Sequence, residues 1–259
     1  MKYSLLRYYY TQFFSISSPH STTSAFFKPL FYEYPNDVNA WEDIERHIML
    51  GSAIMFSPNI RPDTTTSEDF YFPAGTWADI NGGSVIVSTG KKQTLYTGTD
   101  KINLHMREGH IIPFQNAIER NRLKVHELKD IFTNIIMSLD STGAAKGRIY
   151  FDDGETVGGP NVLVDLTASL TGKMLTIKNK VVSARDVRIL EDEFLYISEI
   201  KILNAKNKAL TNPGTVTDQF GNQIMTETFA YDSTKEWIMI RLGIQIPYAE
   251  DFELRVNFT

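Results

Sequence analysis

The sequence contains no cysteine, which excludes disulfide bridges, thiolate nucleophiles and cysteine-based zinc sites. A chain of 259 residues can build a large core without such cross-links, so this absence does not identify a compartment. No apolar run approaches the roughly 18–20 residues of a membrane span, and charge interrupts residues 1–7 too early for a signal peptide. We therefore predict no membrane span and no signal peptide in this chain, and its localisation stays open.

Positive charge is also limited, because 26 Lys and Arg residues face 31 Asp and Glu residues, for a net charge of -5. Without a long basic run, the chain has no electrostatic means of capturing nucleic acid or an anionic membrane. The balance of 42% hydrophobic and 22% charged residues is typical of a folded protein. We expect one large domain or two smaller ones, and no nucleic-acid partner.

Motifs of common catalytic chemistry are missing. There is no Gly-x-Ser-x-Gly elbow, Walker loop or Gly-x-Gly-x-x-Gly turn, so nothing supports a hydrolase triad, a nucleoside triphosphate or a dinucleotide. The histidines have no paired spacing that is typical of a zinc site. They are His20, His47, His105, His110 and His126. We predict no metal site and no cofactor.

Two local features allow either a functional or a structural interpretation. Asp152, Asp153 and Glu155 form an acidic cluster around Gly154, which could bind a hard cation or supply an acid/base pair. Asp-Gly is also common in hairpin turns, and adjacent strand side chains point to opposite faces, so a structural turn is preferred. Trp77 could stack on a sugar ring, but packing in the core or at the edge of a sandwich is preferred.

The first fifty residues differ in pattern from the rest. Aromatic residues crowd into residues 3–14 without Gly or Pro, which predicts a helix that is apolar nearly all round. Residues 26–35 form a nearly continuous apolar run that predicts a strand covered on both faces. Asn36 and Asp37 are positioned to cap a helical stretch that continues through Ile48 and ends at Gly51. This order is typical of a fragment of an α/β fold.

From Ile54 onward, short β-branched and aromatic runs alternate with turn-forming residues. Alternation in residues 173–178 and 253–258 predicts antiparallel strands with one wet face. These strands are too many for one small sandwich, and the polar stretch 116–122 is the expected boundary between two. The predicted fold is mainly β, with two antiparallel β-sandwich domains.

Six segments, in this order, resemble the C-terminal part of glycoside hydrolase family 31, the α-glucosidase family. Residues 3–11 (YSLLRYYYT), 28–35 (KPLFYEYP) and 49–58 (MLGSAIMFSP) resemble the end of its catalytic barrel; residues 72–79 (FPAGTWAD), 102–113 (INLHMREGHIIP) and 147–155 (GRIYFDDGE) resemble its two C-terminal sandwiches. Arg7 stands where the family usually has proline, and Lys28 replaces a common arginine, as in a divergent member.

The resemblance implies three parts: residues 1–50 as the last helix-strand-helix of a (β/α)8 barrel, 51–118 as a proximal β-sandwich and 119–259 as a distal β-sandwich. Family members hydrolyse α-glucosides with retention, using two aspartates on barrel strands that precede this part. The chain contains neither of the two motifs, so we assign no catalytic, substrate-binding or metal residue.

The leading hypothesis is a C-terminal fragment of an α-glucosidase-like glycoside hydrolase, with a supporting structural role and no catalysis of its own. Its partner would be the missing catalytic barrel, from the same gene or a separate chain, and an α-glucoside or oligosaccharide would bind only through the complete enzyme. Complete family members are often secretory-pathway or lysosomal. The alternative is a stand-alone β-sandwich module that binds carbohydrate or protein without hydrolase activity, and a third is a decayed fragment without function.

Overall fold

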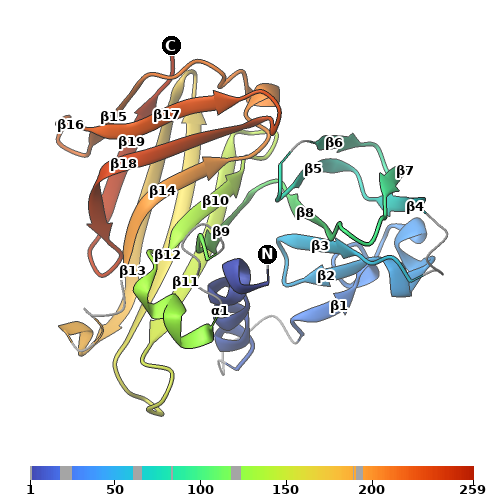
Figure 1. Ribbon diagram of the computed structural model, residues 1–259, viewed down its shortest axis with the longest axis horizontal. Helices are drawn as coiled ribbons and strands as arrows, with labels where there is room; N and C mark the ends of the chain where they lie inside the picture. Colours follow the sequence, from blue (N-terminus) through green and yellow to red (C-terminus); the bar gives the residue numbers. More distant parts are fainter. Residues whose placement is uncertain are drawn as a thin grey trace.

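The computed structural model describes residues 2–17, 25–60, 66–82, 84–117, 124–188, 190 and 195–259. In these ranges the protein is mainly β, which confirms the predicted class. Figure 1 shows an eleven-stranded sheet on the left, smaller sheets on the right and the single α-helix of the described ranges below their junction. None of the helices in the described ranges is long and apolar enough to cross a membrane.

The elements in chain order are η1 (Tyr3–Leu5), α1 (Leu6–Ser17), β1 (Phe27–Pro29), η2 (Leu30–Tyr32), η3 (Val38–Trp41), η4 (Ile44–Arg46), β2 (Ile48–Leu50), β3 (Ile54–Ser57), β4 (Ser67–Phe72), β5 (Gly75–Asp79), β6 (Val85–Ser88), β7 (Lys91–Tyr96), β8 (Asn103–Arg107), β9 (His110–Phe114), η5 (Val125–Asp130), β10 (Asn134–Ser138), β11 (Ala144–Asp152), β12 (Asn161–Thr171), β13 (Met174–Arg185), β14 (Tyr196–Ile202), η7 (Lys206–Lys208), β15 (Thr215–Asp218), β16 (Gln223–Ile224), β17 (Thr226–Asp232), β18 (Trp237–Pro247) and β19 (Phe252–Asn257). Each η element is a short 3₁₀-helix.

The eleven-stranded sheet has the order β16-β15-β19-β13-β12-β11-β9-β10-β14-β18-β17. It curls so that β14 and β18 lie over β12 and β13, as Figure 1 shows. One hydrophobic cluster joins the two layers, with Ile200 and Ile240 on one side and Val164 and Ile177 on the other, all fully buried. Leu175 and Ile177 alternate with more exposed neighbours, as the sequence pattern predicts. The sheet therefore packs as a β-sandwich.

Two strand pairs depart from the antiparallel order expected from the sequence. β10 runs parallel to β14, with Ile135 opposite Ile200, and β11 is parallel to β9 where Lys146 meets His110. Parallel neighbours need a long connection and are usually covered on both faces. β10 meets both conditions, because all its residues are buried and residues 139–195 separate it from β14.

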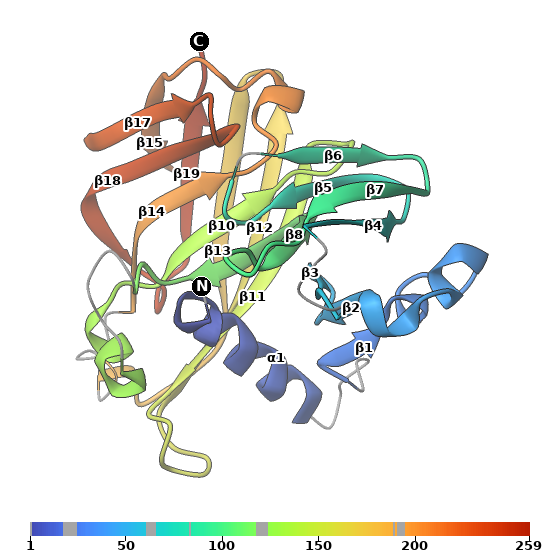
Figure 2. The ribbon, with the colours of Figure 1, turned by 45° about the vertical axis from the view of Figure 1, so that its right-hand side comes forward.

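The smaller sheets pack against each other. The six-stranded sheet has the order β1-β2-β3-β8-β5-β6, and β4 pairs with β7 in a separate ribbon. Phe70 and Phe72 of this ribbon share a hydrophobic cluster with Met49, Met55 and Trp77 of the six-stranded sheet. The chain then passes directly from β8 into β9 of the eleven-stranded sheet, as seen from the side in Figure 2.

The glycine in the turn between β8 and β9 is needed for its backbone conformation. Gly109 has a φ of +77°, in the left-handed region that favours glycine. Its N–H donates to the carbonyl of Ser138 at 2.7 Å, so the turn is bonded to β10. The turn therefore attaches the end of β8 to β10 of the larger sheet.

The first predicted helix is present, and the strand that follows is shorter than expected. η1 and α1 cover residues 3–17 and include the predicted helix over residues 3–14. The apolar run 26–35 forms a strand only in β1, because residues 30–32 turn into η2. α1 lies against β9 and β11 of the eleven-stranded sheet.

The second predicted helix, ending at Gly51, is wrong as a continuous element. Asp37 does cap η3, since its carboxylate accepts the N–H of Asn39 at 3.1 Å. Asp43 then has a φ of +47°, and this left-handed residue ends the helical path between η3 and η4. Ile48 begins β2, which pairs with β3 across Gly51. Most of the expected boundary at 116–122 lies outside the described residues.

Candidate functional site

The most extensive contact of α1 is with β11, through stacked aromatic rings. The ring of Phe14 lies 3.6 Å from that of Tyr150 between centroids, at an interplanar angle of 6°. Tyr10 stacks on the same tyrosine at 6.1 Å. The guanidinium of Arg7 lies 4.9 Å from the ring centroid of Phe151. These contacts fix both the position and the rotation of α1 on the sheet.

Polar contacts at the end of β11 strengthen the same interface. The phenol of Tyr10 donates to the Asp152 carboxylate, with both oxygens at 2.8 Å. The hydroxyl of Thr11 accepts the backbone N–H of Tyr150 at 3.1 Å. Burial and the neighbouring Asp152 carboxylate both raise the pKa of Tyr10. Asp152, a member of the acidic cluster, is therefore an anchor for α1.

The rest of the acidic cluster belongs to its own turn. The Asp153 carboxylate accepts the N–H groups of Thr156 at 2.9 Å and Glu155 at 3.0 Å. These backbone bonds lower the pKa of Asp153 to about 2. Gly154 has a φ of +72°, and Glu155 is exposed. Within the described ranges no three His, Cys, Asp or Glu side chains are grouped to hold a metal ion.

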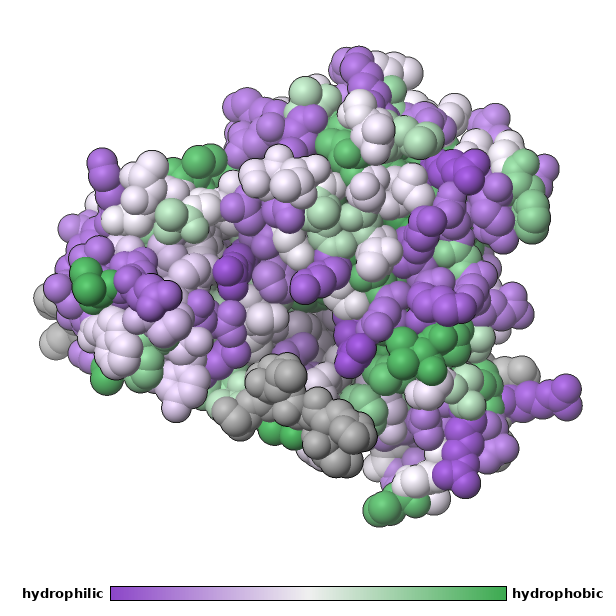
Figure 3. All heavy atoms as spheres, turned by 180° about the vertical axis from the view of Figure 1, so that it is seen from behind, coloured by the Kyte–Doolittle hydropathy of each residue, from purple (hydrophilic) through white to green (hydrophobic). Residues whose placement is uncertain are grey.

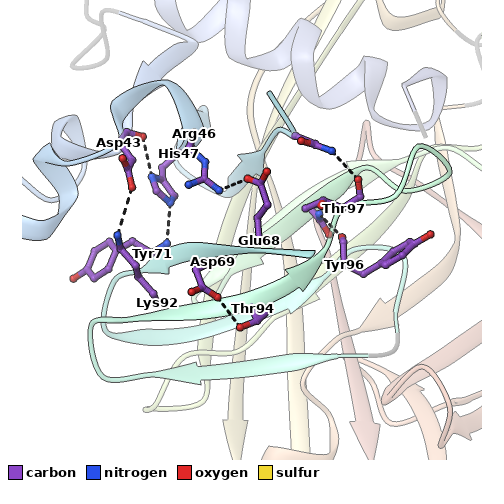
Figure 4. Close-up of polar contacts among 12 residues, drawn as sticks. Asp43, Arg46, His47, Glu68, Asp69, Tyr71, Lys92, Thr94, Tyr96 and Thr97 are labelled. Atoms are coloured by element: carbon purple, nitrogen blue, oxygen red, sulfur yellow. Dashed lines mark hydrogen bonds and ion pairs between the residues drawn. The ribbon is translucent and has the colours of Figure 1, made fainter. Parts of the chain in front are cut away.

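His47 links the segment before β2 to the β4–β7 ribbon, as Figure 4 shows. Its Nδ1 lies 3.1 Å from the carbonyl of Asp43, and its Nε2 accepts the N–H of Tyr71 at 2.8 Å. Arg46 forms a buried ion pair with Glu68 of β4 in the same close-up. Burial lowers the pKa of His47. This histidine therefore holds neighbouring elements together and is not positioned as a metal ligand.

Trp77 and His105 lie in the interior of the smaller sheets. Trp77 is 1% exposed and its indole N–H donates to the carbonyl of Pro73 at 3.0 Å, so the core interpretation is confirmed. His105 is fully buried, with its ring edge-on to Phe72 at 5.0 Å, and neither ring nitrogen has a hydrogen-bond partner among the residues that the structure describes. Burial lowers the pKa of His105 to about 4.

The other histidines are not brought together. The Nδ1 of His110 lies 2.9 Å from the carbonyl of Glu108, and burial lowers the pKa of this imidazole. His126 is exposed in η5, and His20 lies outside the described residues. The five histidines of the sequence therefore supply no assembled site in the part of the chain that the structure describes.

A cavity of about 460 Å³ lies where the smaller sheets meet the larger one. Its wall includes Arg107, whose guanidinium contacts the Glu33 carboxylate at 3.2 Å and lies 4.7 Å from the ring centroid of Tyr34. Glu33 also pairs with Lys28, which is buried. His110 faces the same cavity. The arrangement ties residues 28–34 to β8 through charge-assisted contacts.

Apolar exposure is concentrated in the first fifty residues. The large apolar side chains exposed there, which we call the N-terminal apolar surface, are Tyr10, Phe13, Phe27, Tyr32, Val38, Trp41 and Ile44. Phe27 is 58% exposed and Val38 is 77% exposed. On the face opposite that of Figure 1, hydrophobic side chains form only small separate patches among polar ones (Figure 3). Large exposed apolar side chains are therefore more frequent in this segment than in the rest of the described chain.

Sequence reasoning did not identify Tyr150 as the platform for α1 or Asp152 as its anchor. The alternation in β11 shows that Tyr150 and Phe151 face opposite sides of the sheet, but not which element covers each side. The sequence signal for this contact is the presence of aromatic residues in both partners, residues 3–14 and positions 150–151.

Comparison with known protein families gives a match over part of this chain. Residues 23–112 match the family described as Glycosyl hydrolase family 31 C-terminal domain. The resemblance of this chain to the C-terminal part of family 31 is therefore confirmed.

Curated relatives are named as α-glucosidases or related enzymes. Probable maltase-glucoamylase 2 of Homo sapiens is 36% identical over 157 residues, which cover 60% of this chain and 6% of that protein. Lysosomal alpha-glucosidase of Mus musculus is 29% identical over 266 residues, which cover 94% of this chain and 25% of that protein. The chain thus spans a quarter or less of the length of these two relatives.

Solved structures share the fold over the whole chain. The ER glucosidase II heterodimeric complex matches with a TM-score of 0.77 at 21% identity, covering 100% of this chain and 28% of that chain. A GH31 dextranase from Flavobacterium johnsoniae matches with a TM-score of 0.76 at 17% identity, covering 99% of this chain and 31% of that chain. At these identities the likeness is one of fold.

Proposed function

We propose that this chain is the C-terminal structural part of an α-glucosidase-like glycoside hydrolase and is not catalytic alone. In this proposal residues 1–50 complete the catalytic barrel, and residues 51–118 and 119–259 form the proximal and distal sandwiches. The observation that carries it is the N-terminal apolar surface, which lies in the segment whose motifs resemble the end of the barrel.

The energy of that surface supports the proposal. Its seven side chains are between about 40% and 80% exposed, so covering each would contribute roughly 1 kcal/mol. Their sum is on the order of 5–10 kcal/mol, similar to the total stability of a domain. A surface of this size is costly to leave in water, and the remainder of a barrel would cover it.

The chemistry would come from the part that precedes these residues. Retaining hydrolysis of a glycoside needs two carboxyl groups about 5–5.5 Å apart on either side of the reacting carbon. The carboxylates described above are engaged otherwise: Asp152 anchors α1, Asp153 caps its own turn and Glu33 pairs with Lys28 and Arg107. The sandwiches would hold α1 and β1 in place, and an α-glucoside would bind only to the complete enzyme.

The hairpin of β2 and β3 crosses the proposed boundary at residue 50. Strand pairing of this kind would transmit the position of residues 27–50 to the proximal sandwich. α1 is in turn held by the distal sandwich through Tyr150 and Asp152. Each sandwich therefore contacts a different part of the segment assigned to the barrel, which is the arrangement that a supporting role requires.

The proposal is tested by sedimentation of the chain of residues 1–259. If the N-terminal apolar surface normally lies against a barrel, the chain alone should self-associate at micromolar concentration. Substituting Phe27→Ser and Val38→Ser together should reduce that association several-fold. Phe220→Ser is the matched control, because Phe220 is 80% exposed in the turn between β15 and β16.

Self-association that falls with the double substitution and not with the control supports the proposal. A wild-type chain that is monodisperse and unaffected by the double substitution contradicts it. That second result would favour the stand-alone module, whose surface would then need no partner.

A further inference from the structure

A second cavity, of about 690 Å³, lies on the eleven-stranded sheet and is unrelated to the contacts of α1. This volume is within the range of about 300–1,000 Å³ that is typical of small-molecule sites. Polar side chains from four strands and the segment after β9 line it, and these are Asn116, Asn134, Ser198, Glu227, Arg241 and Gln245.

A buried carboxylate forms the floor of this cavity. Glu199 has a side chain that is 2% exposed, at an irregularity in the pairing of β14 with β18. Its Oε2 accepts a hydrogen bond from the Nη2 of Arg241 at 2.8 Å, and its Oε1 lies 3.3 Å from the Nζ of Lys201. The amide of Asn116 lies 3.3 Å from both carboxylate oxygens. Burial opposes ionisation of Glu199, but Lys201 and Arg241 outweigh it and hold its pKa below the usual value.

These contacts make the floor rigid. Asn134 accepts the N–H of Glu199 at 2.9 Å and that of Ser198 at 3.2 Å, which fixes the backbone beneath the carboxylate. Burying two charges costs desolvation energy that can cancel their attraction, so apolar residues at these positions would often stabilise the fold equally well. A buried ion pair is therefore not explained by stability alone. Here the pair opens onto a cavity, and the Arg241 side chain remains 39% exposed.

The charges around the cavity balance. Among the described residues of the lining, Arg241 is the one cation, and Glu199 and the exposed Glu227 are carboxylates. Lys201 lies outside this lining but pairs with Glu199 at 3.3 Å, so two cations offset two carboxylates. A balanced site gives no net attraction for an anion or a cation. It offers many donors and acceptors, together with apolar atoms of Leu242 and Ile244 in the same wall. That combination suits a neutral ligand with many hydroxyl groups and an apolar face.

We propose that this cavity is a binding site for a neutral oligosaccharide, held by Arg241, Glu227 and Gln245 over the Glu199 floor. No residue of this site belongs to residues 1–50, so the inference goes beyond the supporting function and does not depend on it. The site would bind a sugar chain without cleaving it, since both oxygens of Glu199 are occupied by Arg241, Lys201 and Asn116.

The test is calorimetric titration of the chain with trisaccharides of different charge. Maltotriose, isomaltotriose, cellotriose and mannotriose are the neutral probes, with a galacturonic acid trimer and a glucosamine trimer as the anionic and cationic ones. We expect at least one neutral trisaccharide to bind at micromolar to millimolar concentration, and both charged trimers to bind at least tenfold more weakly.

The variants Glu227→Ala and Gln245→Ala should each weaken that binding about tenfold, the effect of losing one good hydrogen bond to a ligand. Both side chains are exposed, so folding should be unchanged. Glu250→Ala, which removes an exposed carboxylate outside the cavity, should leave the affinity as it is. Binding of no neutral trisaccharide, preferred binding of a charged trimer, or full affinity in both cavity variants would each overturn the inference. None of these results bears on the self-association that tests the supporting function.

Discussion

Replacing the buried histidine of β8 should remove a defined part of the acid sensitivity of this fold. Burial lowers the pKa of His105 from 6.5 to about 4, with the Asp79 carboxylate opposing and the Lys101 ammonium adding to the shift. In the unfolded chain the imidazole returns to its ordinary pKa. Between these two values the unfolded state binds a proton that the folded state does not, so stability falls as the pH falls.

The size of the effect follows from the difference between the two pKa values. At about 1.4 kcal/mol per pH unit, the contribution of His105 is roughly 3 kcal/mol. It is fully present above about pH 6.5 and is lost as the pH falls to about 4. His47 and His110 have pKa values lowered in the same direction, so the wild-type chain should lose more than this in total.

The substitution His105→Leu isolates the share of this one residue. It keeps a side chain of similar size against Phe72 and removes two ring nitrogens that no described residue bonds, so stability at pH 7.5 should be equal or higher. Urea unfolding followed by tryptophan fluorescence reports on Trp77, which is buried in the same part of the fold.

We expect the loss of unfolding free energy between pH 6.5 and pH 4.5 to be smaller by about 2–3 kcal/mol in this variant than in the wild type. His126→Leu, at an exposed histidine, is the matched control and should follow the wild-type curve. If His105→Leu showed the full wild-type pH dependence, the conclusion that burial keeps His105 unprotonated in the folded state would be refuted.

Three further experiments test individual positions. Gly147→Ala should destabilise the fold by about 3 kcal/mol or more, because a Cβ there would lie 2.1 Å from the carbonyl oxygen of Ile111; chemical denaturation measures this. Gly154→Val should cost about 1–2 kcal/mol, and Gly154→Asn less, because φ is +72° and no described residue beyond its two chain neighbours lies within 4 Å of a new Cβ, so only the backbone is strained. A double-mutant cycle of Tyr10→Phe and Asp152→Asn should give a coupling of about 1 kcal/mol, whereas a coupling near zero would show that this contact does not anchor α1.

Elements that depend only on the pattern of their own residues could be predicted from the sequence. The aromatic helix, the alternating strands such as β13 and the turn at Gly154 depend on local pattern, and all are present. The helix expected to end at Gly51 failed because Asp43 adopts a left-handed conformation, which tertiary contacts of its neighbours Arg46 and His47 with β4 support. Such contacts leave no periodicity in the sequence.

The larger cavity illustrates a second limit. Glu199 and Arg241 are separated by 42 positions and meet only because β14 pairs with β18. In the sequence each is a charged residue among mostly apolar ones, and such residues usually lie on a solvated face. The parallel pairing of β10 with β14 was equally hidden, because strand direction depends on the path of the connection.

The measurement that tests the central claim most directly is the denatured mass of the native polypeptide in its source cells, detected with an antibody raised against residues 119–259. The account predicts a band about four times heavier than the 29.5 kDa of this chain, as the 25% coverage of mouse lysosomal alpha-glucosidase implies, and α-glucosidase activity in the immunoprecipitate. A band near 29.5 kDa without a co-precipitating catalytic chain would contradict the claim that these sandwiches support a glycoside hydrolase barrel.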